Sequence, residues 1–182
     1  YAWDPSVRAA HLDQTHGFFN GACVFLLPLG HEHAPCQVDI LPPAARLMPT
    51  PWRVITGLKP ARGTKRQGFG TYTATDYDEL IDCPVEMGTF AHATFNVFGT
   101  PHEIAVTGQV PKLDLKRLAS DLQRVCEAQV ALFEPRRKTA PFAKYSFLIT
   151  AVSNGYGGLE HRNSTALLCK REDLPHTGMK DS

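Results

Sequence analysis

The sequence predicts a mainly β protein with an α+β part at its C-terminal end, and two observations support this fold class. In the first hundred residues, short runs rich in Val, Ile, Phe and Tyr are interrupted by Pro and Gly, which is typical of an antiparallel β-sandwich. Beyond residue 110, apolar residues recur with the period of a helix, and further apolar segments follow. We therefore expect a β-sandwich over residues 1–109 and a smaller α+β unit over residues 110–182.

The strands of the sandwich are predicted from alternating apolar residues and from the turn residues between them. The opening letters, YAWDPSVRAA, are already typical of a strand. Alternation places Trp52, Val54 and Thr56 on one face of their segment. The last two segments are expected to form a hairpin joined through Thr100-Pro101. Strands are expected over residues 21–27, 36–41, 52–58, 70–82, 90–99 and 102–110.

The second unit begins with an amphipathic helix. Between residues 114 and 133, apolar residues recur every three or four positions, which predicts about five helical turns. Asp114 is the expected N-cap, and Pro135 prevents much continuation. Residues 144–152 form a nearly continuous apolar run, as expected of a strand buried on both faces. A glycine-rich turn then leads to a last predicted strand, residues 158–171.

Composition and charge exclude several classes of partner. Apolar residues make up 43% and charged residues 20% of the 182 residues, and the formal net charge is +1. Such a chain has no basic field for nucleic acid or for an anionic membrane surface. No apolar run reaches the roughly 18 residues that a membrane helix needs. We expect neither a nucleic-acid nor a membrane partner.

The cysteines indicate a reducing compartment. They are odd in number and scattered, and no C-x-x-C pair occurs, which argues against a disulfide scaffold and a zinc ribbon. Cys126 and Cys169 lie in apolar patterns and are expected to be core residues. A cytoplasmic location is the simplest interpretation. A periplasmic one stays open, because the chain begins without Met and is interpreted as an excised fragment.

Two segments resemble the zinc-binding pattern H-E-x-x-H without completing it. HEHAP, residues 31–35, has Pro35 in place of the second histidine, and HEIAV, residues 102–106, has Val106 there. His31 and His33 could share a metal as an H-x-H pair, although a polar loop between strands is the favoured interpretation. No metal site is therefore predicted within this chain.

Two further segments carry candidate binding residues. The segment 77–88 concentrates Asp78, Glu79, Asp82 and Glu86, either as solvated turn carboxylates, which is favoured, or as carboxylates near a cleft. The segment GYGGLEH, residues 155–161, could present a sheet edge to an extended peptide, with a glutamate to pair with an ammonium group. From spacing alone, a plain glycine turn before a strand is favoured there.

Several rare letter combinations, in order along nearly the whole chain, carry a family resemblance. They are YAWDPSVRAAHLD, GFFNGACVFL, PPAARLMPTPWRVITGL, TATDYDELIDCPVEMGTF, GTPHEIAVTGQV and YGGLEHRNSTALLCKREDLP. On these segments the chain resembles the glycyl aminopeptidase family of zinc metallopeptidases. The resemblance implies a β-sandwich followed by the leading mixed sheet and helix of a thermolysin-like catalytic domain. It also implies that the zinc-binding helix lies beyond Ser182, so the full-length enzyme would hold zinc and this fragment would hold neither metal nor catalytic residues.

The resemblance also implies binding residues. The segment GGLEH is similar in position to the G-x-M-E-N motif of aminopeptidase N relatives, which aligns a peptide backbone and binds its free amino group. Carried over, Gly157, Gly158 and the adjoining Leu159 would line the backbone, and Glu160 would bind the N-terminus. His161 replaces the Asn of those relatives. Glu86 is added as a second ammonium ligand near the entrance of the cleft.

The leading hypothesis is thus a fragment of a zinc-dependent aminopeptidase that releases N-terminal residues, with a Gly or Ala preference implied by the resemblance. Its partners would be a peptide with a free N-terminus and the rest of its own catalytic domain. The fragment alone is expected to be inactive and to self-associate weakly through the sheet of residues 145–171. The main alternative is a non-catalytic peptide- or protein-binding module. A weaker one is a carbohydrate-binding sandwich that uses Trp3 and Trp52.

Overall fold

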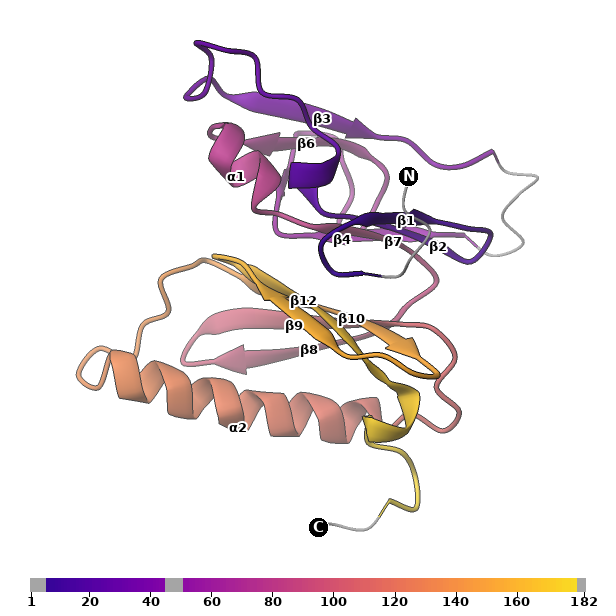
Figure 1. The fold of residues 1–182 in the computed structure, drawn as a ribbon. Helices are drawn as coiled ribbons and strands as arrows, with labels where there is room; N and C mark the ends of the chain where they lie inside the picture. The colour runs from indigo at the N-terminus through magenta and orange to yellow at the C-terminus, as the bar shows by residue number, and fades with distance from the viewer. Residues whose placement is uncertain (1–5, 45–50, 180–182) are drawn as a thin grey trace.

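The computed structural model describes residues 6–44 and 51–179, which form three stacked β-sheets and one long helix (Figure 1). We name the sheets by position. The outer sheet has the strand order β3-β6-β5, the middle sheet β1-β2-β7-β4 and the mixed sheet β11-β12-β10-β9-β8. Helix α2 covers the far side of the mixed sheet. Each apolar core therefore lies between two neighbouring layers.

The outer and middle sheets form the predicted antiparallel sandwich. Val54 and Val85 of the middle sheet pack against Ile40 and Tyr72 of the outer sheet, and all of these side chains are buried. Ile55 points the opposite way, into the core shared with the mixed sheet. The strands are β1 (Ala10–Leu12), β2 (His16–Phe19), β3 (Cys36–Ile40), β4 (Arg53–Thr56), β5 (Lys59–Pro60), β6 (Gly70–Ala74) and β7 (Val85–Gly88).

The mixed sheet is centred on β10, which pairs in parallel with β9 on one side and with β12 on the other. Strand β10 is buried on both faces, as its apolar run predicted: Phe147 and Ile149 face the helix, whereas Leu148 faces the middle sheet. The edge strands β8 and β11 pair antiparallel with β9 and β12. The strands are β8 (Ala91–Val97), β9 (Thr100–Thr107), β10 (Tyr145–Val152), β11 (Gly157–Glu160) and β12 (Ser164–Lys170).

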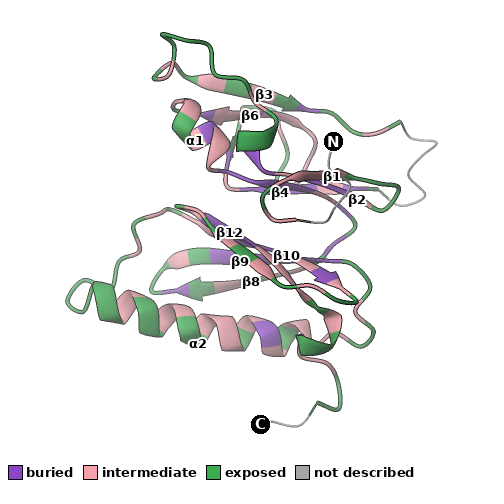
Figure 2. Ribbon diagram, in the orientation of Figure 1, coloured by how far each residue is buried: buried purple, intermediate pink, exposed green. Residues whose placement is uncertain are grey.

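Helix α2 (Leu115–Phe133) confirms the helical period. The side chain of Asp114 accepts a hydrogen bond from the backbone N–H of Arg117 at 2.9 Å, as expected of an N-cap. Leu118 packs against the buried Ile104 of the mixed sheet, while the outer side of the helix stays exposed (Figure 2). The helix packs most closely over β8, so the β11 end of this sheet face is left open.

The strand predicted over residues 21–27 is wrong, and the strand predicted over residues 70–82 is wrong in part. Residues 21–27 contain a 3-10 turn, η1 (Gly21–Cys23), because Asn20 caps it through the N–H of Ala22. The predicted strand 70–82 ends at Ala74 and is followed by a short helix, α1 (Tyr77–Ile81). That helix is capped by the Asp76 side chain, which accepts from the N–H of Glu79 at 2.8 Å.

The two hairpins of the mixed sheet also differ from expectation in detail. The turn of the first lies at Phe98-Gly99, whose φ values of 47° and 90° suit a two-residue hairpin loop, and Thr100-Pro101 already belongs to β9. The segment 158–171 is not one strand, because it turns back at residues 161–163 to form β11 and β12.

The first hairpin belongs to the mixed sheet and not to the sandwich, so the chain changes sheets between β7 and β8. The division into domains at residue 109 remains a prediction. After β12 the chain forms a 3-10 turn, η3 (Arg171–Asp173), and Leu174 returns to the core beside α2. Among the described residues, neither helix has the length and apolar character needed to cross a membrane.

Candidate functional site

The segment that the sequence singled out, Gly157–Glu160, is strand β11 at the edge of the mixed sheet. Its one neighbour among the described strands is β12, with Gly157 opposite Leu168 and Glu160 opposite Thr165. The other side of its backbone is therefore not paired within the part of the chain that the structure describes. An unpaired strand edge of this kind is able to accept a further strand.

The register assigns the side chains of β11 to the two sides of the sheet. Glu160 lies opposite Thr165, which is itself level with Phe147 on the helix-facing side. Leu159 lies opposite Ala166, which faces the middle sheet. Because α2 lies over the other end of the helix-facing side, Glu160 is exposed to solvent.

The carboxylate of Glu160 has no hydrogen-bond or ion-pair partner among the described residues. Its negative charge acts on Tyr145, whose pKa is raised to about 12 by burial and also by nearby negative charges that include Glu160. Beside Tyr145, on the same side of the sheet, lies an apolar cavity of about 370 Å³ between β10 and the C-terminal half of α2. Cys126, Phe133, Phe142 and Phe147 are among its lining residues. The edge carboxylate thus lies on an open face and is not used by the fold itself.

His161 has a different position from Glu160, although the two are adjacent. Its side chain is 6% exposed, and its Nδ1 lies 3.2 Å from Oδ1 of Asp82. The other oxygen of Asp82 accepts a hydrogen bond from the backbone N–H of Arg162 at 3.0 Å. Asn163 donates from its side chain to the carbonyl of Gly57 at 3.2 Å. The turn that follows β11 is therefore fastened to the sandwich, and His161 serves this attachment.

The acidic segment 77–88 contains solvated carboxylates only in part: Asp78 is exposed in α1, whereas the other three acids have partners. Glu79 accepts from both the N–H and the hydroxyl of Thr75, and Asp82 holds the β11–β12 turn. Glu86 lies in the middle of β7 and is 2% exposed. This burial contradicts its predicted position at a cleft entrance, because no ligand's ammonium group can reach it there.

The Glu86 carboxylate lies between the middle and mixed sheets. Its Oε1 is 3.0 Å from Nδ1 of His16 and accepts a hydrogen bond from the hydroxyl of Thr107 at 3.0 Å. Burial raises the pKa of Glu86, although the bonds from His16 and Thr107 partly oppose this. In the sequence, only the apolar neighbours Pro84 and Val85 indicate that Glu86 is buried.

The two incomplete zinc patterns do not fit a peptidase-type metal. His31 and His33 are exposed in the loop before β3, in line with the favoured interpretation. His102 is buried in β9, with its Nδ1 3.0 Å from the carbonyl of Thr100. Glu103 is buried beside it and paired with Lys144, whose Nζ lies 2.6 Å away. Neither pattern therefore brings together the ligands of a peptidase-type zinc.

Trp52 packs in the interior at 8% exposure, so it offers no sugar platform, and Trp3 lies outside the described residues. Cys126 and Cys169 are partly buried against the helix-side core, as predicted.

Comparisons with known proteins show what this chain is similar to. Residues 1–89 match the family model described as the Peptidase M61 N-terminal domain. The whole chain is similar to an aminopeptidase N family protein from Idiomarina loihiensis, with 41% identity and a TM-score of 0.91. This alignment covers 100% of this chain and 30% of that one. No curated protein matches the chain.

Two more distant structures share the fold alone. An M1 zinc metallopeptidase from Deinococcus radiodurans has 13% identity and a TM-score of 0.52, over 91% of this chain and 38% of that chain. Aminopeptidase A from Legionella pneumophila, in complex with aspartic acid, has 11% identity and a TM-score of 0.53, over 89% of this chain and 20% of that chain. Together the comparisons support a peptidase family and the predicted fold class, and this chain spans less than half of each solved relative.

Proposed function

We propose that this chain is the N-terminal region of a zinc-dependent aminopeptidase, in which strand β11 aligns a peptide substrate and Glu160 binds its free α-ammonium group. The observation that carries the proposal is an unpaired strand edge whose last residue is an exposed carboxylate without a partner among the described residues. The likeness to the Idiomarina protein over the whole chain supports a peptidase context for this edge.

The geometry of β11 suits an extended peptide. A peptide added to the free edge would make main-chain hydrogen bonds, and the absence of side chains at Gly157 and Gly158 lets its backbone approach closely. An ammonium group at the end of that peptide would form a charge-assisted hydrogen bond with Glu160. A blocked amino terminus would lose this bond. The enzyme would therefore select peptides with a free N-terminus. We further propose that it prefers Gly or Ala as the N-terminal residue.

We place zinc and its ligands in a part of the full-length protein outside this chain, and we expect this chain alone to have no peptidase activity. A cytoplasmic location also remains part of the proposal. The five cysteines are all free thiols, which agrees with a reducing compartment.

The test compares Glu160→Gln with the parent in the full-length protein, using an aminoacyl reporter with a free amino group and its N-acetylated counterpart. Loss of one charged hydrogen bond predicts a fall in kcat/KM of roughly 10- to 150-fold for the free reporter, from about 1.5–3 kcal/mol. The N-acetylated reporter should be a poor substrate of both proteins. Glu172→Gln is the matched control, because Glu172 is an exposed acid in η3.

Unchanged kcat/KM in Glu160→Gln, or equal cleavage of both reporters, would refute the assigned role of Glu160. A full-length protein that cleaves no peptide and is insensitive to chelators would refute the peptidase itself. In that case the non-catalytic peptide-binding module takes its place, and binding of a free-amino peptide to the edge of β11 becomes the measurement.

A further inference from the structure

We propose that His11, Asp13 and His16 bind one divalent transition-metal ion, zinc(II) being the best match, at a site distinct from the peptide-binding edge. The three side chains each offer a ligand atom, and these atoms all lie within 4.8 Å of one another. The cluster lies at the hairpin of β1 and β2, where the middle sheet faces the mixed sheet.

The hairpin register brings the two histidines to one face. His11 lies directly opposite Phe18, and His16 precedes Phe18 by two residues, so all three side chains are on the same side of the strands. Phe18 is buried in the core between the middle and mixed sheets, which identifies that side. His11 and His16 are accordingly only 14% and 12% exposed, and their ring centroids are 4.8 Å apart.

Asp13 is fixed by the turn of the same hairpin. Its Oδ1 accepts hydrogen bonds from the backbone N–H of Thr15 at 2.6 Å and of His16 at 3.0 Å. These bonds orient Oδ2, which lies 3.1 Å from Nε2 of His11. Two ligands of one zinc ion, with bonds of about 2.0–2.1 Å, lie roughly 3–3.5 Å apart. The His11–Asp13 pair already has this separation, and small side-chain rotations would bring in the third ligand.

Glu86 gives His16 the support that a metal-binding histidine needs. With Nδ1 of His16 directed at the buried Glu86 carboxylate, 3.0 Å away, Nε2 is the atom left with a lone pair. That nitrogen has no hydrogen-bond partner among the described residues. A carboxylate behind the imidazole fixes its tautomer and raises its basicity, as in many zinc sites. The charges also balance, because Asp13 and Glu86 together offset the two positive charges of the ion.

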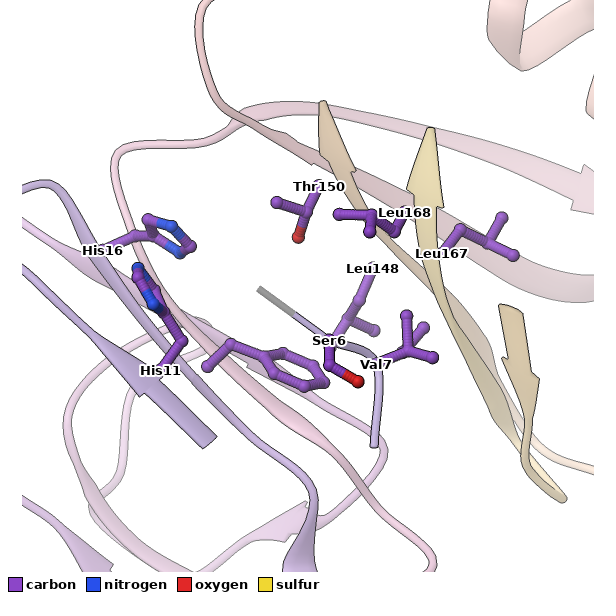
Figure 3. Close-up of a pocket in the computed structure, with 10 residues that line it drawn as sticks. Ser6, Val7, His11, His16, Leu148, Thr150, Leu167 and Leu168 are labelled. Carbon is purple, nitrogen blue, oxygen red and sulfur yellow. The ribbon is translucent and has the colours of Figure 1, made fainter. Parts of the chain in front are cut away.

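A small cavity adjoins the two imidazoles. It has a volume of about 20 Å³, which is room for about one water molecule or one small exogenous ligand. Figure 3 shows His11 and His16 on one side of it, with Leu148, Thr150 and Leu168 of the mixed sheet opposite. Zinc is often bound by three protein ligands with a fourth position left for water or another small ligand. Imidazole ligands favour zinc over magnesium or calcium.

The site is separate from Glu160, because the two lie on opposite sides of the mixed sheet. The cavity beside the histidines borders the side that faces the middle sheet, whereas Glu160 lies on the helix-facing side. An ion bound here would hold the β1–β2 hairpin in place and stabilise the folded chain. This proposal replaces the expectation that the chain binds no metal.

The test uses the 182-residue chain, stripped of metal, and titrates it with Zn²⁺ in competition with a chromophoric chelator. We expect one equivalent to bind, and the melting temperature to rise with free Zn²⁺ as ligand linkage requires. Asp13→Asn keeps the turn's hydrogen-bond acceptor but loses the charge, and it should weaken binding at least 10-fold. His16→Ala should do the same, and Glu86→Gln should weaken binding roughly 10- to 100-fold.

His31→Ala and His33→Ala are matched controls, because both remove exposed loop histidines. They should bind Zn²⁺ as the parent does. Circular dichroism establishes that each variant is folded before titration. The proposal is overturned if the folded parent chain binds no Zn²⁺ at 100-fold excess. It is equally overturned if Asp13→Asn and His16→Ala bind as tightly as the parent, or if the loop variants account for the loss.

Discussion

Replacing Asp82 with alanine should loosen strand β11 and destabilise the chain. Asp82 is the C-cap residue that follows α1 and lies in the sandwich, yet its two carboxylate oxygens contact the turn after β11. One is 3.2 Å from Nδ1 of His161, and the other accepts from the N–H of Arg162 at 3.0 Å. The substitution removes both contacts and leaves the imidazole of His161, 6% exposed, without that partner.

The magnitude follows from opposing contributions. A hydrogen bond to a charged group contributes about 1.5–3 kcal/mol, and two such bonds would give at least about 3 kcal/mol if fully buried. The Asp82 side chain is 26% exposed, so water replaces part of the loss. A negative charge at a helix C-terminus is unfavourable by about 0.3–1 kcal/mol, and its removal favours the variant. We expect a net loss of about 2 kcal/mol in the free energy of unfolding.

Equilibrium unfolding in urea measures this loss, and amide hydrogen exchange in Gly157–Glu160 reports on β11 itself. Asp78→Ala is the matched control, since Asp78 is an exposed acid in the same short helix. It should change stability by less than about 0.5 kcal/mol. If Asp82→Ala unfolds like Asp78→Ala, or if exchange in β11 is unchanged, the attachment of the turn to the sandwich does not stabilise the edge strand.

Three further outcomes are expected. Burial alone would raise the pKa of Glu103, but Lys144 and hydrogen bonds outweigh burial and lower this pKa. The ionised Glu103 therefore stabilises the fold above about pH 4.5, and this stabilisation is lost as the pH falls further. The urea midpoint should fall less with decreasing pH in Lys144→Met than in the parent. Gly108→Ala should lower the melting temperature more than Gly99→Ala. Both glycines have a positive φ, but a Cβ atom at residue 108 would lie 2.4 Å from a backbone oxygen, whereas a Cβ atom at residue 99 would meet no atom within 4 Å. Sedimentation velocity should show weak self-association that Tyr156→Lys reduces, because this residue is 95% exposed beside the edge strand, and a clean monomer at high concentration would contradict it.

Local patterns in the sequence predicted the elements that depend on local spacing. The apolar repeat of α2 and its cap at Asp114 were recognised because both lie within one helix. The sequence places the hairpin turn at Thr100-Pro101, whereas the structure has it at Phe98-Gly99. Pro101 is tolerated within β9 because the pairing of β9 with β10 begins only at His102. Helix α1 was missed because one turn of helix gives no periodic signal, and only the cap at Asp76 marks it.

The candidate site residues divide along the same line. The sequence singles out Glu160 because its glycine-rich context is local, and the edge position of β11 leaves its carboxylate exposed, while its binding role stays a prediction. Glu86 was misplaced because its environment is created by the stacking of two sheets: His16 comes from β2 and Thr107 from β9. A carboxylate held between two layers needs partners from both, and no spacing in the sequence specifies which strands those layers bring together. The same stacking turns His11 and His16 inward beside Glu86, so the proposed metal site, like the burial of Glu86, follows from the packing of the middle sheet on the mixed sheet and not from a motif.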